Sequence, residues 1–136
     1  MDNGNERPDS GSSVGIGPEE GPRRILIVED DISTREALKD ALVDEGFSVV
    51  EAENGERALD QMKALAPHLV LTDLMMPGMS GMELIREMSS RRGLCDLPIV
   101  IMTAARNMSA VPPGHPVFLK PLRVEALVRT LSGFLS

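Results

Sequence analysis

An aspartate lies where a short apolar run meets a turn in the segment LVLTDLMMPGMSG, residues 69–81. Asp73 follows the run LVLT, and Pro77 and Gly78 come shortly after it. Proline and glycine predict a turn, because proline fixes one backbone dihedral angle and glycine tolerates unusual ones. A carboxylate at the end of a buried strand contributes little to packing and can instead act as a nucleophile or bind a cation. Acids at strand ends also begin turns, so Asp73 alone leaves both interpretations open.

Other polar residues follow apolar runs in the same way. The run ILIV precedes Glu29, Asp30 and Asp31, the run IVIMT ends at Thr103, and the run VFL precedes Lys120. Each has an ordinary explanation when taken singly. Either aspartate could cap a helix, a strand threonine usually packs and hydrogen-bonds locally, and a lysine before a proline is usually solvated. Their shared position after matching runs favours one common site.

Together these side chains predict a site for a divalent cation and a phosphoryl group. Several carboxylates in one pocket repel one another and raise one another's pKa unless a cation neutralises them. Mg²⁺ prefers oxygen ligands and binds through a few carboxylates, waters and phosphate oxygens. The Thr103 hydroxyl can donate a hydrogen bond and the Lys120 ammonium group supplies positive charge. Both therefore suit phosphoryl oxygens held on a carboxylate nucleophile.

The elements that must position these residues alternate along the chain. Apolar runs predict five strands, at residues 25–28, 47–52, 69–72, 99–103 and 117–119. Helical patterns run from about Ser33 to Glu45, with Ser33 or Thr34 as the cap, and then around residues 58–65, 82–88 and 124–131. This alternation predicts an α/β fold, with a doubly wound five-stranded parallel sheet and helices on both faces. In such sheets the site lies beyond the carboxyl ends of the strands.

Composition limits the class of protein. The chain has 136 residues, 42% of them hydrophobic, with a formal net charge of -7 and one cysteine. The acidic balance argues against nucleic-acid binding, and no apolar stretch predicts a membrane span or a signal peptide. We therefore expect a cytoplasmic protein without a disulfide framework. Residues 1–22, rich in Gly, Pro, Ser and acids, predict a disordered tail, and residues 23–136 predict one domain.

Over about residues 23–135 the sequence resembles the receiver domain of bacterial two-component response regulators, the CheY-like family. The segments ILIVEDD, LVLTDLMMPGMSGMEL, IVIMTA and FLKPL carry the resemblance in order and spacing. The family has the flavodoxin-like strand order 2-1-3-4-5. The resemblance implies that Asp73 accepts a phosphoryl group from a histidine kinase or phosphotransfer protein.

The resemblance also assigns roles to the other site residues. Asp30, Asp73 and the backbone carbonyl of Met75 would bind Mg²⁺ directly, and Glu29 would bind it through water. Thr103 would donate a hydrogen bond to the phosphoryl oxygens and Lys120 would form an ion pair with them. The peptide bond before Pro121 would be cis. Asp31 would have at most a minor role.

The output side departs from the family. The segment RNMSAVPPGHP, residues 106–116, holds three prolines and predicts a fourth helix that is short or absent. Val117 stands where the family has its switch aromatic, and Phe118 should point to the opposite face of the strand. Only 16 residues follow Lys120, so we expect no DNA-binding output domain. We also expect a monomer that binds an unknown downstream protein or relays the phosphoryl group.

Two alternatives belong to other classes. The chain could be a phosphorylation-independent adaptor that keeps the fold and binds proteins only. It could also be an enzyme, such as a phosphatase with an aspartyl nucleophile. The resemblance disfavours the enzyme, because such phosphatases carry a second acid two positions after the nucleophile, where this chain has Met75. We expect no enzymatic activity beyond phosphoryl acceptance and self-dephosphorylation.

Overall fold

The computed structural model describes residues 21–135. Residues 1–20 of the predicted tail lie outside the described residues. The described residues contain five strands: β2 (Arg24–Val28), β3 (Ser48–Ala52), β4 (Leu69–Asp73), β5 (Ile99–Thr103) and β6 (Val117–Leu119). The helices are α1 (Ile32–Asp44), α2 (Gly55–Ala64), α3 (Gly81–Ser89), α4 (Val124–Leu135) and a 3-10 helix, η3 (Ala105–Ala110). No helix within this part of the chain is long and apolar enough to cross a membrane.

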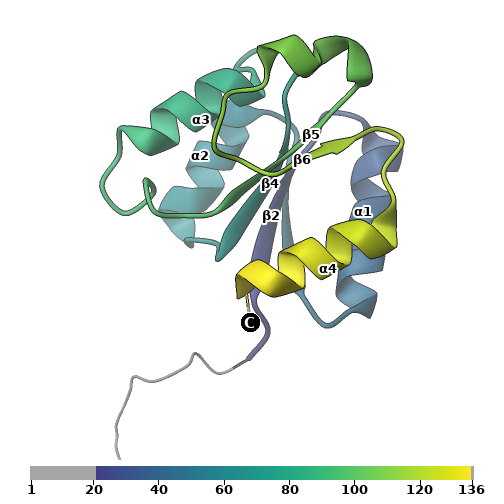
Figure 1. Cartoon of the computed structure of the whole chain (residues 1–136). Helices are drawn as coiled ribbons and strands as arrows, with labels where there is room; N and C mark the ends of the chain where they lie inside the picture. Colours follow the sequence, from purple (N-terminus) through teal and green to yellow (C-terminus); the bar gives the residue numbers. More distant parts are fainter. Residues whose placement is uncertain (1–20, 136) are drawn as a thin grey trace, which may run out of the picture.

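The strands form one parallel sheet with the order β3-β2-β4-β5-β6. Counted along the chain this is the order 2-1-3-4-5, so the predicted doubly wound fold is confirmed. Figure 1 shows α2 and α3 on one side of the sheet and α1 and α4 on the other. The sheet is therefore covered on both faces, which explains why its strands are continuous apolar runs.

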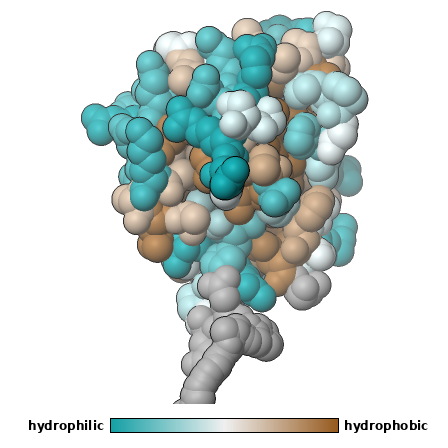
Figure 2. All heavy atoms as spheres, turned by 90° about the vertical axis from the view of Figure 1, so that its left-hand side faces the viewer, coloured by the Kyte–Doolittle hydropathy of each residue, from teal (hydrophilic) through white to brown (hydrophobic). Residues whose placement is uncertain are grey.

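Each face of the sheet has its own hydrophobic core. Side chains alternate along a strand, so Leu26 and Val28 of β2 pack in one core and Ile25 and Ile27 pack in the other. The first core includes buried residues of α2 and α3, and the second includes buried residues of α1 and α4. Strands β4 and β5 are buried along their whole length. On the face drawn in Figure 2, hydrophobic residues are interspersed with hydrophilic ones.

Helix α1 begins earlier than its sequence pattern predicts. Its N-cap is Asp31, whose backbone is extended and whose side chain accepts a hydrogen bond from the Thr34 N–H at 2.9 Å. The prediction that Ser33 or Thr34 caps this helix is wrong. A carboxylate is acceptor-only and carries negative charge, which the helix N-terminus stabilises, so Asp31 serves better than a hydroxyl two or three residues later.

The segment between β5 and β6 forms no α-helix. It contains the 3-10 helix η3, which has no buried residues and no side-chain cap, followed by the proline-rich residues 111–116. The predicted loss or shortening of the fourth family helix is confirmed, since proline lacks the N–H that a helix needs. Val117 packs against the core on the α2 and α3 side, and Phe118 packs against the other core. The Lys120–Pro121 peptide bond is cis, as the resemblance implies.

Gly81, the first residue of α3, touches the backbone of the candidate nucleophile. Its N–H donates to Leu74 O at 2.9 Å, and a Cβ at this position would lie 2.1 Å from Asp73 O. We expect Gly81→Ala to lower the free energy of unfolding by about 1–3 kcal/mol, because the backbone must shift to admit the methyl group. Denaturant unfolding followed by circular dichroism measures this, since the chain has no Trp or Tyr.

Gly133 in α4 gives the matched control, because a Cβ there would meet no atom within 4 Å. Gly133→Ala should be neutral or stabilise the protein by up to about 1 kcal/mol, as alanine favours helix over glycine. Equal loss of stability in the two variants would contradict the assignment of the Gly81 effect to its contact with Asp73.

Candidate functional site

The polar residues predicted from the sequence meet at the carboxyl ends of the strands. Asp73 is the last residue of β4 and Thr103 is the last residue of β5, whereas Glu29 directly follows β2 and Lys120 directly follows β6. Parallel strands end at the same edge of a sheet, so residues far apart in the chain become neighbours there. The sheet topology alone therefore builds a candidate site.

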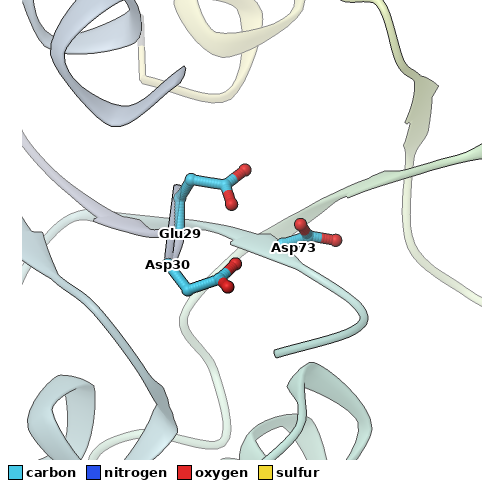
Figure 3. Close-up of side chains that lie close together, drawn as sticks. All are labelled: Glu29, Asp30 and Asp73. Atoms are coloured by element: carbon cyan, nitrogen blue, oxygen red, sulfur yellow. The ribbon is translucent and has the colours of Figure 1, made fainter. Parts of the chain in front are cut away.

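Three carboxylates form an acid cluster, defined as Glu29, Asp30 and Asp73. One oxygen from each lies within 4.8 Å of the others. Figure 3 shows Glu29 and Asp30 beside each other at the end of β2, across from Asp73 at the end of β4. Glu29 and Asp73 are buried and Asp30 is exposed, so the cluster has an open side.

Lys120 supplies the cation of the cluster. Its Nζ donates to Glu29 Oε1 at 2.6 Å and to Asp73 Oδ2 at 2.7 Å. Burial lowers the pKa of Lys120, but the hydrogen bonds to Asp73 and Glu29 outweigh this and raise the pKa above its usual value. Burial raises the pKa of Glu29, and the hydrogen bond from Lys120 opposes that rise. The ammonium group is therefore held charged between two buried carboxylates.

Each polar atom of Glu29 forms a hydrogen bond. Its Oε2 accepts the Asp31 N–H at 3.1 Å, and its own N–H donates to Ala52 O at 3.0 Å. Its carbonyl accepts Nη1 of Arg35 at 2.7 Å. A buried side chain with this many partners has one orientation, which is toward Lys120 and Asp73.

Asp73 is held from three sides. Its Oδ1 accepts the Met75 N–H at 3.3 Å, its Oδ2 accepts Lys120, and its backbone oxygen accepts the Thr72 hydroxyl at 2.9 Å. The Met75 side chain is exposed at the surface. The role of the Met75 carbonyl as a metal ligand stays a prediction.

Thr103 and Asp31 complete the set of predicted residues. Thr103 is fully buried, and within residues 21–135 its hydroxyl donates only a long hydrogen bond of 3.5 Å, to Ala104 O. Asp31 is exposed and caps α1, and the hydrogen bonds from Thr34 hold the pKa of its carboxyl below the usual value. Of the two aspartates that could cap the helix, Asp31 does so and Asp30 belongs to the acid cluster.

The acid cluster fits a hard divalent cation. Its three carboxylates offer oxygen atoms close enough for one ion, and the single ammonium of Lys120 balances only part of their charge. Oxygen donors of this kind are the ligands that Mg²⁺ prefers, and the open side at Asp30 leaves room for waters. The chemistry of the donor set therefore suits Mg²⁺.

Sequence reasoning missed one residue of this region, Arg35, whose guanidinium contacts both the Glu29 carbonyl and the Glu51 side chain. The signal in the sequence is its position in the first turns of α1, close to the loop that carries Glu29 and Asp30. Side chains on a helix lean toward its N-terminus, so an arginine one turn after the cap can reach the preceding loop.

Comparison with known proteins assigns the chain to a family. The family model for the response regulator receiver domain matches residues 25–131. Response regulator MprA of Mycolicibacterium vanbaalenii is 36% identical over 119 residues, which cover 84% of this chain and 51% of that protein. A response regulator MprA of Mycobacterium avium is 35% identical over 117 residues. This chain thus spans about half the length of the curated relatives it matches.

Solved structures agree with this assignment. The chemotaxis response regulator CheY4 of Vibrio cholerae superposes with a TM-score of 0.74 at 27% identity, covering 84% of this chain and 99% of that one. Response regulator TrrA of Thermotoga maritima, solved in complex with Mg(2+)-BeF, has a TM-score of 0.75 at 31% identity, covering 83% and 99%. By fold and family match alike, this chain belongs to the response regulator receiver domains of two-component signalling.

Proposed function

We propose that this chain accepts a phosphoryl group on Asp73, with Mg²⁺, from a histidine kinase or a phosphotransfer protein. It then signals by phosphorylation-dependent protein binding or by relaying the phosphoryl group. One observation carries the proposal: Asp73 is a buried carboxylate at a strand end, with Lys120 Nζ at 2.7 Å and two further carboxylates beside it. Family membership supports it, and the proposal places the chain in the bacterial cytoplasm with the kinase domains that would phosphorylate it.

The transfer is a displacement at phosphorus. A carboxylate oxygen of Asp73 forms a bond to phosphorus, and the bond from phosphorus to the donor's imidazole nitrogen breaks. The leaving nitrogen keeps the electron pair of that bond, and a proton already on the other ring nitrogen of the donor makes the departing histidine a neutral imidazole. The product is an acyl phosphate on Asp73. The fixed orientation of Asp73, held by Met75 and Lys120, aims the carboxylate before the donor arrives.

Negative charge on the phosphoryl group must be offset for this step. Lys120 is cationic and would exchange one carboxylate contact for a phosphoryl oxygen. Thr103 has only a long hydrogen bond to give up, so its hydroxyl is available as a donor. When bound, Mg²⁺ supplies further positive charge, and Asp30, Asp73, the Met75 carbonyl and, through water, Glu29 would hold it.

Hydrolysis of the acyl phosphate would return Asp73 to its starting state, and we propose no further enzymatic activity. A phosphatase with an aspartyl nucleophile would need a second acid two positions after Asp73. The position two residues after Asp73 holds the exposed, apolar Met75, which cannot move a proton.

The first prediction of this proposal concerns the nucleophile. Incubation with acetyl phosphate and Mg²⁺ should add one phosphoryl group to the wild type, and Asp73→Asn should lose this incorporation because an amide is a poor nucleophile. Intact-mass spectrometry measures both. Asp31→Asn is the matched control, since Asp31 lies outside the acid cluster and asparagine caps helices equally well.

Incorporation of a phosphoryl group into Asp73→Asn, equal to that of the wild type, would refute the assignment of the nucleophile. No incorporation in the wild type, together with partner binding that does not depend on phosphorylation, would favour the adaptor alternative.

The second prediction tests whether Mg²⁺ binding depends on Lys120. Lys120→Met removes the ammonium group but leaves the three carboxylates, so Mg²⁺ should still bind. Without Mg²⁺ the variant should lose about 3 kcal/mol of unfolding free energy, because two buried carboxylates are left without their cation. Added Mg²⁺ should then stabilise Lys120→Met more than it stabilises the wild type. Denaturant unfolding in EDTA and in Mg²⁺ measures both effects.

A Lys120→Met variant that Mg²⁺ does not stabilise would contradict this prediction. It would show that Lys120, rather than the acids, determines metal binding.

The third prediction concerns the response to activation. We expect the beryllofluoride-activated protein to stay monomeric, with its main changes in hydrogen exchange in residues 73–81 and at the start of α1. The physical reason is that η3 has no buried residues and prolines restrict residues 111–116, so this segment has few alternative backbone states. Light scattering and hydrogen exchange, with and without beryllofluoride, test it. A dimer on activation, or the largest change within residues 106–116, would contradict it.

A further inference from the structure

Arg35 connects the loop of residues 29–31, which carries two members of the acid cluster, to the neighbouring strand β3. Its Nη1 donates to the backbone carbonyl of Glu29 at 2.7 Å, and its Nε donates to Glu51 Oε1 of β3 at 3.3 Å. Its side chain is only 18% exposed, so the guanidinium is held in place rather than solvated. Arginine can make both contacts at once because its donors form a rigid planar fork.

The carbonyl that Arg35 holds belongs to the peptide that joins Glu29 to Asp30. This peptide is planar, so a fixed carbonyl direction also fixes where the Cα of Asp30 lies. The Glu29 N–H is bound to Ala52 O at 3.0 Å, and Ala52 directly follows Glu51 in β3. Strand β3 thus anchors the backbone of Glu29 at its N–H directly and at its carbonyl through Arg35.

Asp30 depends on this anchor more than its neighbours in the acid cluster do. Glu29 and Asp73 both accept a hydrogen bond from Lys120. Within residues 21–135, no hydrogen bond or ion pair reaches the exposed carboxylate of Asp30. Its place beside the other two acids is therefore set by its backbone.

We propose that Arg35 is a positioning residue for the acid cluster. By fixing the peptide between Glu29 and Asp30, it aims the Asp30 carboxylate at the space shared with Asp73, and so prepares the site for Mg²⁺. The inference rests on the proposed function, because it assigns Arg35 a task in the same metal-dependent site. In this role Arg35 would act through the backbone of Glu29, without itself binding the metal or the phosphoryl group.

Lys39 is the control residue that distinguishes positioning of the backbone from an ordinary ion pair with Glu51. Its Nζ lies 3.3 Å from the other oxygen of Glu51, and its side chain is 46% exposed. It shares the partner, the charge and the helix of Arg35. It has no hydrogen bond to the loop of residues 29–31 within the described chain. Lys39→Met therefore removes an ion pair to Glu51 and leaves the Glu29 carbonyl bound.

Calorimetric titration with Mg²⁺ tests the proposal on the wild type, Arg35→Met, Lys39→Met and Arg35→Lys. Arg35→Met should bind Mg²⁺ about tenfold more weakly, as expected for the loss of an outer-shell partner. Lys39→Met should change the affinity by less than about twofold, since exposed ion pairs contribute little. Arg35→Lys should recover part of the affinity, because lysine keeps the charge but cannot bond both partners.

Amide resonances give a second readout that does not depend on the metal. In Mg²⁺-free protein, Arg35→Met should shift the Asp30 and Asp31 amide signals, while Lys39→Met should leave them in place. If Arg35→Met does not fold, Glu51→Gln serves instead, since it keeps Arg35 and removes its charged anchor. Glu51→Gln should then weaken Mg²⁺ binding by more than Lys39→Met does.

Equal Mg²⁺ affinity in Arg35→Met and Lys39→Met would overturn the positioning role, as would an unchanged affinity in Glu51→Gln. A wild type that binds no Mg²⁺ would instead refute the proposed function on which the inference rests. The two failures are therefore distinguishable in one set of titrations.

Discussion

The repulsion among three carboxylates at one edge of the sheet is the constraint on which the rest of this site depends. Glu29 and Asp73 are buried, and burial penalises a carboxylate's charged form. Lys120 relieves both, although it lies 91 positions from Glu29 and 47 from Asp73 in the chain. A lone ammonium cannot balance three acids, so the folded chain holds a site that a further cation would stabilise. Stability and chemistry are thus linked through the same few atoms.

The sheet makes this concentration of charge possible. Strand β4 is buried on both faces, so two hydrophobic cores fix the backbone position of Asp73, and its contacts with Met75 and Lys120 orient the side chain. Gly81 lets the start of α3 approach the backbone of Asp73, where any side chain would collide with its carbonyl. Asp73 therefore stands at the end of a rigid strand, and apolar packing on both faces of the sheet helps Lys120 to offset the repulsion among the acids.

The sequence predicts the strands and the residues after them because both leave marks in residue type. Runs such as IVIMT predict β5 with its observed bounds, and Asp73, Thr103 and Lys120 follow from the ends of such runs. Two features were not settled by this reasoning. Asp31 was one of several possible caps of the first helix, because the hydroxyl residues nearby suit that role equally well by type. Arg35 was missed because its main acceptor is a backbone carbonyl, which every residue carries and which no residue type marks.

The segment between β5 and β6 differs from the family, whereas the loop after Asp73 makes direct contacts with α2. The position of the family's switch aromatic holds Val117, which packs against the core on the α2 and α3 side, whereas Phe118 packs against the opposite core. The loop after Asp73, in contrast, is docked on α2. The Met79 N–H donates to Glu56 Oε1 at 3.4 Å, and a Cβ at Gly55 would lie 2.8 Å from Met79 Cγ. Because interiors are close-packed, a shift of this loop on phosphorylation would have to displace Met79 against the start of α2. The loop after Asp73 thus contacts the start of α2 directly, whereas η3 has no buried residues.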